Sequence, residues 1–291
     1  MKFIIPTSFI DPTHFLAMAK AADASGWWAI ALSDHVVHPE HIESSYPYSE
    51  DGRAYWGADN PWPDPWVSVG AMAAVTERLR FLTNIYILPV RHPILVAKAV
   101  GTAAVLSGSR VALGIGVGWM REEFELLGQD FKTRGKRTDE AIDVLRLLWR
   151  GGTVEHHGEH YSFDRLAMSP APSKPIPIYC GGLSKPALRR AATRCDGWIS
   201  VVHSLDEIKG FVRQLRELRA DSEHAGEPFE VIVSCTDAFD VDGYRRLEDA
   251  GATGLITVPW LFYGGDAKSV EGKCDGIRRF ADDIIAPMAA G

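Results

Sequence analysis

The chain has 291 residues, and its 31 Lys and Arg against 38 Asp and Glu give a formal net charge of −7. This balance argues against non-specific nucleic-acid binding, which needs clustered positive charge. With 46% hydrophobic and 24% charged residues, the composition is that of a globular protein and excludes a disordered or fibrous one.

Compartment and membrane contact are predicted from the chain start and the cysteines. The first ten residues meet Pro6 before any long apolar core forms, so we do not expect a signal peptide. No stretch approaches the roughly 20 apolar residues that span a bilayer. The four cysteines lie far apart without a CxxC pair, which favours reduced thiols over disulfides or a zinc site. The sequence therefore predicts a cytoplasmic protein without a membrane or nucleic-acid partner.

Short apolar runs, typical of buried strands, alternate with longer runs that have helical spacing. In the first half, strands are predicted at 3–5, 28–32, 80–88 and 110–115. The first three are followed by predicted helices at 12–25, 65–78 and 93–106, and the fourth is followed by two, at 121–127 and 134–150. In the second half, strands are predicted at 176–179, 197–202, 230–234 and 254–258, followed by helices at 185–194, 205–224, 244–250 and 276–288. Two insertions interrupt the repeat, at 36–64 and 151–174.

Such alternation requires parallel strands joined by crossover helices, because each helix must cover a face of the sheet. Eight units favour a single (β/α)8 TIM barrel over an open doubly wound sheet, and we expect one domain over residues 1–291. In a barrel, chemistry belongs at the carboxyl ends of the strands, where the loops converge.

The second predicted strand ends in Ser33-Asp34-His35. A carboxylate beside an imidazole fixes its tautomer or raises its basicity, and histidine titrates near working pH. Asp34 and His35 are therefore the candidate catalytic residues. The alternative is that Asp34 caps a loop and His35 packs at the barrel rim.

Two glycine-rich segments also follow predicted strands. Gly114–Trp119 is not a dinucleotide fingerprint, because GxGxxG would need glycine at 119 or 121, where Trp119 and Arg121 stand. Its glycines either let a flat ligand approach or simply pack inside the barrel. Gly181-Gly182-Leu183-Ser184 opens a helix whose free amides would attract an anion, phosphate above all, or it is an ordinary turn with Ser184 as N-cap.

Other polar and aromatic clusters have plainer interpretations. Glu122 and Glu123 begin a helix, where negative charge suits the helix dipole without a catalytic role. The histidine-rich 156–160 segment fits a surface hairpin turning at Gly158 better than a metal site. The aromatic insertion at 36–64 and the loop at 260–272 would serve either as lids over an apolar ligand or as a subunit interface, as in a homodimer.

Together, these segments resemble the bacterial luciferase-like flavin and deazaflavin oxidoreductase superfamily over most of the chain. The runs that carry the resemblance are 26–35, 88–93, 106–110, 114–119, 123–124, 181–184, 190–192 and 196–198, in that order and spacing. The resemblance implies a tricyclic ring in the barrel mouth, backed by a bulge with a non-prolyl cis peptide on the third strand. It also implies that the Gly181-Gly182 turn holds the cofactor phosphate. The cofactor-binding candidates are Asn84, Ile85, Tyr86, Gly116, Gly118, Trp119, Gly181, Gly182, Leu183 and Ser184.

The Asp34-His35 pair resembles the corresponding segment of the deazaflavin-dependent branch. In that branch, a histidine after the second strand lies beside the ring and donates or accepts the proton that accompanies hydride transfer. The resemblance thus implies coenzyme F420 as cofactor, with FMN in an oxygen-activating monooxygenase as the alternative. Sugar-phosphate dehydrogenases of this branch carry a catalytic glutamate where Trp119 stands, with Glu122 and Glu123 as the candidates to stand in for it here. The aromatic mouth favours a small apolar substrate instead.

Two other function classes are weighed against this assignment. A barrel metal hydrolase would need an HxH motif that the first strand, ending Ile5-Pro6-Thr7, lacks, and we expect no metal. A binding barrel without a cofactor would leave Asp34 and His35 buried and satisfied by each other.

Overall fold

Side chains along each barrel strand point alternately into the barrel and toward the surrounding helices. Within β1 (Lys2–Pro6), Ile4 belongs to an interior cluster with Ala31 and Ile232, whereas Phe3 and Ile5 belong to the larger cluster beneath the helices. Because successive side chains of a strand point to opposite faces, one apolar run supplies both layers. The core therefore sits partly inside the barrel and mostly between its strands and the surrounding helices.

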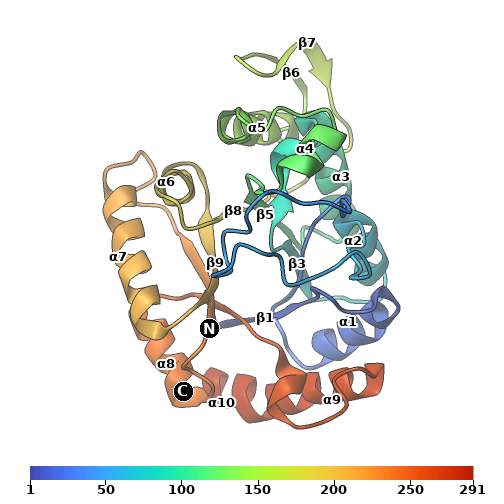
Figure 1. Ribbon diagram of the computed structural model, residues 1–291, viewed down its shortest axis with the longest axis vertical. Helices are drawn as coiled ribbons and strands as arrows, with labels where there is room; N and C mark the ends of the chain where they lie inside the picture. Colours follow the sequence, from blue (N-terminus) through green and yellow to red (C-terminus); the bar gives the residue numbers. More distant parts are fainter. Residues whose placement is uncertain (291) are drawn as a thin grey trace.

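The computed structural model describes residues 1–290, and these residues form a closed barrel of eight parallel strands (Figure 1). The sheet order is β3-β2-β1-β11-β10-β9-β8-β5-β4, and a further pairing between β3 and β5 closes it. β3 and β4 are two halves of one barrel strand, since both pair with β5. The barrel strands after β1 are β2 (Ala29–Leu32), β3 (Arg80–Thr83), β4 (Tyr86–Ile87), β5 (Val111–Gly116), β8 (Ile178–Gly181), β9 (Gly197–His203), β10 (Glu230–Cys235) and β11 (Gly254–Ile256). The TIM barrel expected from the sequence is confirmed.

Helices cover the outside of the barrel. They are α1 (Phe15–Ala24), α2 (Pro65–Ala73), α3 (Pro93–Leu106), α4 (Arg121–Leu126), α5 (Arg134–Trp149), α6 (Lys185–Arg194), α7 (Leu205–Ala220), α8 (Val241–Ala250), α9 (Val270–Phe280) and α10 (Ala286–Ala290). A π-helical turn, Ala281–Ile285, joins the last two, and short 3-10 turns lie at Pro12–His14, Leu88–Val90 and Pro259–Phe262. Within residues 1–290, no helix is both long and apolar enough to cross a membrane.

Three predicted elements differ most from the structure in their bounds. The predicted strand 80–88 breaks after Thr83, where the chain bends before β4. The predicted helix 65–78 already ends at Ala73. The last helical stretch begins at Val270 rather than at residue 276, because Ser269 caps it by accepting a hydrogen bond from the Gly272 amide.

The two insertions lie in different places. In Figure 1, the segment between β2 and α2 crosses the open end of the barrel, where the strands end. The insertion before β8 forms an antiparallel hairpin, β6 (Thr153–His157) and β7 (Ser162–Ala167), that projects beyond α5. The expected hairpin is confirmed, and only the first insertion is placed to shape a site at the strand ends.

Candidate active site

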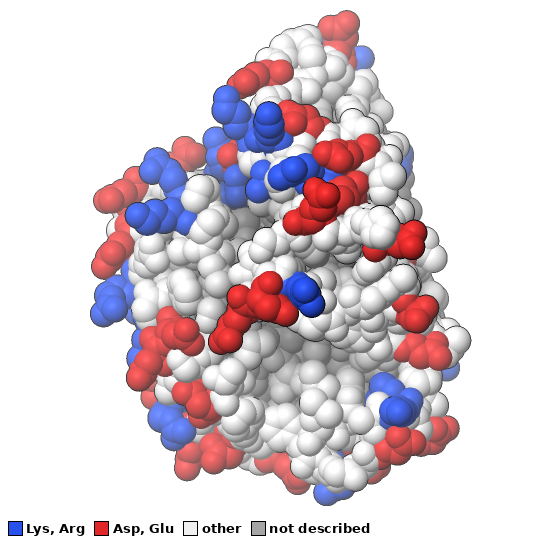
Figure 2. Space-filling view, in the orientation of Figure 1, with Lys and Arg blue, Asp and Glu red and all other residues white. Residues whose placement is uncertain are grey.

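A large cavity of about 910 Å³ opens at the carboxyl ends of the barrel strands. Residues in or after the carboxyl-terminal part of the barrel strands line it, among them Ser8 after β1, Asp34 and His35 after β2, and Thr257 after β11. Figure 2 shows this face hollowed, with uncharged residues around the hollow and a group of mostly acidic side chains beside it in the middle of the face. The cavity lies where the barrel geometry places chemistry, and the residues that could act in it are few.

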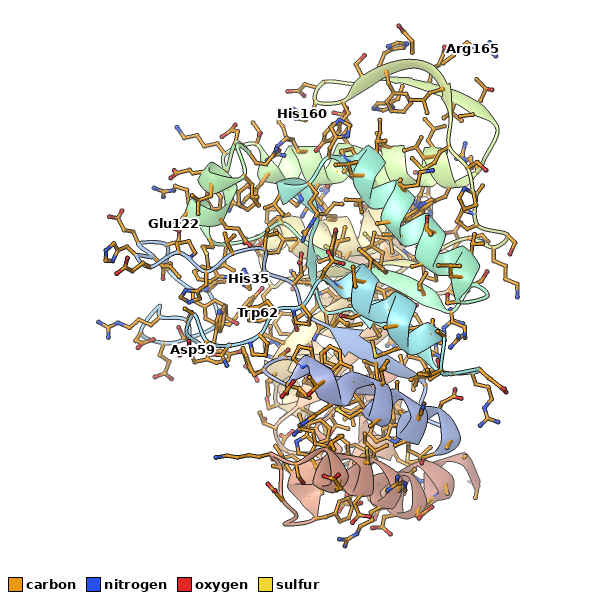
Figure 3. The ribbon with its side chains drawn as sticks, turned by 90° about the vertical axis from the view of Figure 1, so that its right-hand side faces the viewer. His35, Asp59, Trp62, Glu122, His160 and Arg165 are labelled. Carbon is orange, nitrogen blue, oxygen red and sulfur yellow. The ribbon has the colours of Figure 1, made fainter. Side chains whose placement is uncertain are left out.

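His35 stands in the wall of this cavity and is enclosed by aromatic rings. Its ring centroid lies 5.0 Å from that of Trp62, 5.5 Å from Trp56 and 6.1 Å from Trp119. Only 8% of its side chain is exposed. Figure 3 shows His35 beside Trp62 on the side of the molecule that carries the insertion. Aromatic residues of the insertion therefore exclude water from the imidazole, which strengthens the polar contacts that it makes.

The carboxylate that contacts His35 is Glu123, near the start of α4. Its Oε2 lies 3.1 Å from His35 Nδ1, and its Oε1 accepts hydrogen bonds from the amides of Val36 at 2.6 Å and Val37 at 3.5 Å. The Glu123 side chain is fully buried. Glu123 does lie in the first turn of a helix, as the sequence predicts, but its burial and its contact with His35 go beyond a charge that suits the helix dipole. A fully buried acid needs partners that the helix start alone does not supply.

Glu122, one residue earlier, has a different role. Its Oε1 accepts hydrogen bonds from the amides of Glu43 at 2.8 Å and Ser44 at 3.0 Å. Partial burial opposes its ionisation, but these hydrogen bonds outweigh that effect and lower the pKa of Glu122. Glu122 therefore fastens the outer part of the insertion to α4.

Asp34 is not the partner of His35, which corrects the pairing expected from the sequence. Its carboxylate accepts two hydrogen bonds from the Arg91 guanidinium, at 2.7 and 2.8 Å, and one from the Ile87 amide at 3.0 Å. Burial raises the pKa of Asp34, and Arg91 opposes that shift. The Arg91 guanidinium also lies 4.2 Å from the centre of the Tyr86 ring. Asp34 thus ties the end of β2 to the chain around β4.

The expected bulge lies between β3 and β4, and its cis peptide joins Asn84 to Ile85. Ser33 Oγ donates a hydrogen bond to the Asn84 carbonyl at 3.0 Å, so β2 holds the bulge in place. Asn84 and Ile85 line the cavity, as expected. Tyr86 does not line it: its side chain is buried in the outer core, with its ring 5.7 Å from that of Trp66. Tyr86 therefore packs outside the cavity wall.

The glycines after β5 pack against the bulge. A Cβ on Gly116 would lie 1.7 Å from Ile85 Cδ1, so the glycine is needed for close packing behind Ile85 and does not line the cavity. Gly118 and Trp119 do line it. Of the two interpretations left open for this segment, packing accounts for Gly116.

The turn after β8 brings backbone to the cavity wall. Gly181 and Gly182 line the cavity, and Gly182 has a φ of +108°, which favours glycine. Trp198 Nε1 donates a hydrogen bond to the Gly182 carbonyl at 3.0 Å and fixes the turn. Ser184 accepts a hydrogen bond from the Ala187 amide as N-cap of α6, and neither it nor Leu183 lines the cavity. The two glycines are the part of this motif that is available to a ligand.

The histidines of the hairpin form no second site. Glu140 on α5 accepts hydrogen bonds from the amides of His160 and Tyr161, and one of its oxygens lies 3.1 Å from His156 Nε2. Figure 3 shows His160 and Arg165 in the hairpin, well apart from His35. Over residues 1–290, no group of three or more His, Cys, Asp or Glu side chains is arranged to hold a metal ion.

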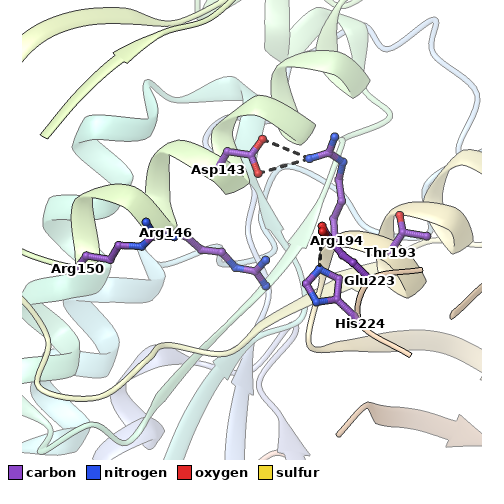
Figure 4. A pocket seen from close by; sticks show the side chains of 7 residues that line it. All are labelled: Asp143, Arg146, Arg150, Thr193, Arg194, Glu223 and His224. Carbon is purple, nitrogen blue, oxygen red and sulfur yellow. Dashed lines mark hydrogen bonds and ion pairs between the residues drawn. The ribbon is translucent and has the colours of Figure 1, made fainter. Parts of the chain in front are cut away.

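A smaller hollow of about 360 Å³ lies at the opposite end of the barrel (Figure 4). It is bounded by the C-terminal ends of α5 and α6 and by the chain after α7, and it contains the ion pair between Arg194 and Asp143 at 3.2 Å. Three arginines also line it, but Arg194 pairs with Asp143 and Arg146 pairs with Asp196 at 3.2 Å. Helix C-termini carry negative partial charge, which disfavours an anionic ligand. This hollow is therefore not the candidate site for a phosphorylated cofactor.

The residues of the main cavity fit a flat, phosphorylated redox cofactor. Ile85 of the bulge and the indole of Trp119 offer apolar surface to a ring, and the Gly181-Gly182 turn offers backbone in the cavity wall. Both glycines are needed for close packing there, because a Cβ on Gly181 would lie 2.8 Å from Ile85 Cγ2 and one on Gly182 3.0 Å from Ala187 Cβ. His35 supplies an imidazole, which can donate or accept a proton. These features suit chemistry in which a hydride and a proton move together.

Comparison with known proteins gives a consistent picture. The family model described as luciferase-like monooxygenase matches residues 5–263. An uncharacterized protein of Mycobacterium tuberculosis is 40% identical over 99% of this chain and 100% of its own length. An F420-dependent glucose-6-phosphate dehydrogenase of Nakamurella multipartita is 28% identical, over 96% of this chain and 78% of its own. Among solved structures, an F420-dependent secondary alcohol dehydrogenase in complex with an F420-acetone adduct has a TM-score of 0.75 at 17% identity, covering 98% of this chain and 99% of its own.

Proposed function

Because the chain belongs to the luciferase-like monooxygenase family, we propose that it is an oxidoreductase that uses coenzyme F420, with His35 as proton donor or acceptor. The observation that carries this proposal is the imidazole in the cavity wall, backed by a buried carboxylate and enclosed by indoles. A bound deazaflavin supplies or accepts a hydride. The substrate must then gain or lose a proton at the same time, which requires a general acid or base within reach.

The relatives support F420 as the coenzyme. The glucose-6-phosphate dehydrogenase that this chain resembles over 96% of its length carries F420 dependence in its name. The family name also covers monooxygenases, and FMN is accordingly the second candidate. Deazaflavin lacks the ring nitrogen through which flavins react readily with oxygen, so the two coenzymes support different reactions.

Each part of the cavity has a task in this proposal. Ile85 and Trp119 would contact the ring, and the Gly181-Gly182 turn would hold its anionic tail through main-chain amides. His35 would hold or release the proton at the substrate. Trp56 and Trp62 would exclude water from the reacting groups, which preserves the strength of these polar contacts.

The other side of the cavity favours an apolar substrate over a sugar phosphate. The ends of β9–β11 and the loops after them contribute hydrophobic side chains, including Val202, Phe239, Val258, Leu261 and Phe262. The lining contains one lysine, Lys273, and no arginine. Its ammonium donates hydrogen bonds to the carbonyls of Lys268 at 2.9 Å and Ser269 at 3.4 Å, which leaves little for a phosphate. We therefore propose a small, uncharged organic substrate, such as a ketone or a secondary alcohol.

Coenzyme titration tests the proposal. Purified protein is titrated with F420 and, separately, with FMN, and binding is followed by coenzyme fluorescence. We expect saturable F420 binding that is much tighter than FMN binding. Saturable FMN binding without F420 binding would reverse the assignment to a flavin monooxygenase.

Turnover then tests the substrate class. With F420 bound, we expect oxidation or reduction of secondary alcohols and ketones, followed at the F420 absorbance band. Glucose 6-phosphate serves as the contrasting substrate, and faster turnover with it would contradict the apolar assignment.

A further inference from the structure

We propose that Glu123 is the positioning residue of His35: its buried carboxylate holds the proton on Nδ1, so that Nε2 is the atom that exchanges a proton in the cavity. This inference rests on the proposed function, but its structural part concerns residues of this chain alone. The family resemblance offers Glu123 as a stand-in for a catalytic glutamate, which is a different role from the one proposed here.

The hydrogen-bond arrangement of Glu123 fixes the direction of each contact. Oε1 accepts from the amides of Val36 and Val37, and Oε2 faces His35 Nδ1 at 3.1 Å. Backbone amides can only donate, so they favour the ionised, acceptor-only form of the carboxylate. The remaining oxygen then requires a donor, and in a neutral imidazole this places the single N–H on Nδ1.

The consequence for Nε2 follows from the same tautomer. With the proton on Nδ1, Nε2 carries a lone pair and accepts a proton from the substrate in one direction of the reaction. Once Nε2 is protonated, the Glu123 carboxylate stabilises the imidazolium, and Nε2 returns that proton in the other direction. One geometry therefore serves both as base and as acid.

Over residues 1–290, the ion pair that the His35 ring makes is with Glu123. Trp56, Trp62 and Trp119 supply the aromatic neighbours of His35. Asp34, its chain neighbour, is fully engaged by Arg91 and the Ile87 amide. In a water-excluded site a fixed carboxylate acts strongly on its partner, so changing Glu123 changes the tautomer preference directly.

A Glu123→Gln variant separates this role from loop anchoring. The amide oxygen of glutamine can still accept from Val36 and Val37, whereas its NH₂ group would face His35 Nδ1 as a donor. The proton of the neutral ring should therefore move to Nε2. Glu122→Gln is the matched control, because Glu122 fastens the same insertion through Glu43 and Ser44 without touching His35.

The experiment has two arms. The first measures the tautomer of His35 in coenzyme-free protein by long-range ¹H–¹⁵N correlation spectra of ¹⁵N-histidine-labelled samples, with the His35 signals identified by their loss in His35→Gln. The second measures kcat and the F420 dissociation constant. We expect the Nδ1–H tautomer in the wild type and in Glu122→Gln, and the Nε2–H tautomer in Glu123→Gln. We expect kcat of Glu123→Gln to fall at least about 100-fold, as when the orienting carboxylate of a catalytic histidine is lost, with the F420 dissociation constant unchanged.

Several outcomes would overturn the inference. An Nε2–H tautomer in the wild type would do so even if Glu123→Gln failed to fold. An unchanged Nδ1–H tautomer in Glu123→Gln, with equal losses of kcat in both variants, would make Glu123 a loop anchor only. If the wild type bound no F420, the proposed function would fail, while the spectra would still decide whether Glu123 sets the His35 tautomer.

Discussion

At the residue scale, neighbours in sequence take up different partners in space. Asp34 and His35 are adjacent in the chain, yet the first contacts Arg91 and the second contacts Glu123. Successive side chains at the end of a strand point in different directions, so adjacency does not pair them. The Asp34 carboxylate therefore stabilises the fold next to the site, whereas the Glu123 carboxylate, 88 residues further along the chain than His35, contacts the His35 imidazole.

Replacing His35 by alanine should remove the proton-exchanging group while leaving the coenzyme contacts in place. We expect kcat to fall by about 100-fold or more, the contribution typical of general acid–base catalysis, with the F420 dissociation constant within a few-fold of the wild type. Steady-state kinetics and fluorescence titration measure the two quantities. His41→Ala, an exposed histidine of the same insertion, is the control. A parallel loss of binding and turnover would instead make His35 a coenzyme contact.

Replacing Asp34 by alanine should act on stability. It leaves the Arg91 guanidinium without its carboxylate and the Ile87 amide without its acceptor, and breaking such a buried pair costs about 3–5 kcal/mol. Urea denaturation measures the free energy of unfolding. Asp143→Ala is the control, because its ion pair with Arg194 is exposed and such pairs contribute less than about 1 kcal/mol. Equal losses in the two variants would show that Asp34 does not stabilise the bulge.

At the element scale, the strand ends with unusual backbone are the ones that shape the cavity. The bend between β3 and β4 places Ile85 in the wall, and the turn between β8 and α6 places Gly181 and Gly182 there. Ser33 and Trp198 hold these two segments by hydrogen bonds to their carbonyls. Backbone that leaves the regular sheet is thus held in place from neighbouring strands.

The turn after β8 is tested by Gly182→Ala. A Cβ there would be strained at a φ of +108° and would sit 3.0 Å from Ala187 Cβ. If the turn donates amides to a phosphate, losing one charge-assisted hydrogen bond costs about 1.5 kcal/mol or more and weakens F420 binding at least about tenfold.

Gly26→Ala is the matched control for this variant, because Gly26 also has positive φ, +79°, but a Cβ there would contact nothing within 4 Å. Fluorescence titration of both proteins measures the effect. An unchanged dissociation constant in Gly182→Ala would place the phosphate elsewhere.

The hairpin β6–β7 depends on Glu140, and this dependence predicts a pH effect. Partial burial raises the pKa of Glu140, but hydrogen bonds from Tyr161, His160 and His156 outweigh it and hold the pKa below its ordinary value of 4.5. A carboxyl whose pKa is lowered by folding stabilises the structure above its unfolded value and loses that contribution as pH falls through its folded value. Hydrogen exchange of the His160 and Tyr161 amides should therefore be well protected above about pH 4.5 and should lose protection below it. Glu140→Gln should remove this pH dependence, and a pH dependence that persisted in the variant would assign it to another group.

The repeat of strands and helices could be predicted from sequence because periodicity and turn residues are local signals. The bend at Asn84–Ile85 could be located within three residues only through the family resemblance. Glu123 could not be assigned, since a helix-initiating acid on the surface and one buried against a distant histidine look alike in sequence. Tyr86 and Gly116, which the resemblance places at the cofactor, do not line the cavity: Tyr86 packs outward and Gly116 packs behind Ile85. Their contact with a cofactor stays a prediction.

At the scale of the whole molecule, the barrel brings the ends of eight strands, counted over residues 1–290, to one opening, and the insertion after β2 crosses it. The residues that line the cavity are mostly uncharged, although a group of mostly acidic side chains lies beside it in the middle of this face (Figure 2). A flat coenzyme and an apolar substrate would both fit such an opening. The homodimer expected from the sequence stays a prediction, which sedimentation equilibrium would measure.

The central claim is that a deazaflavin lies in this opening with His35 beside its reacting face. A crystal structure of the protein in complex with F420 tests it most directly. We expect the F420 ring to lie against Ile85, with His35 Nε2 facing the substrate side of the ring. We expect the anionic tail to contact the amides of Gly181 and Gly182. A ring bound outside the barrel mouth, or a tail held away from that turn, would contradict it.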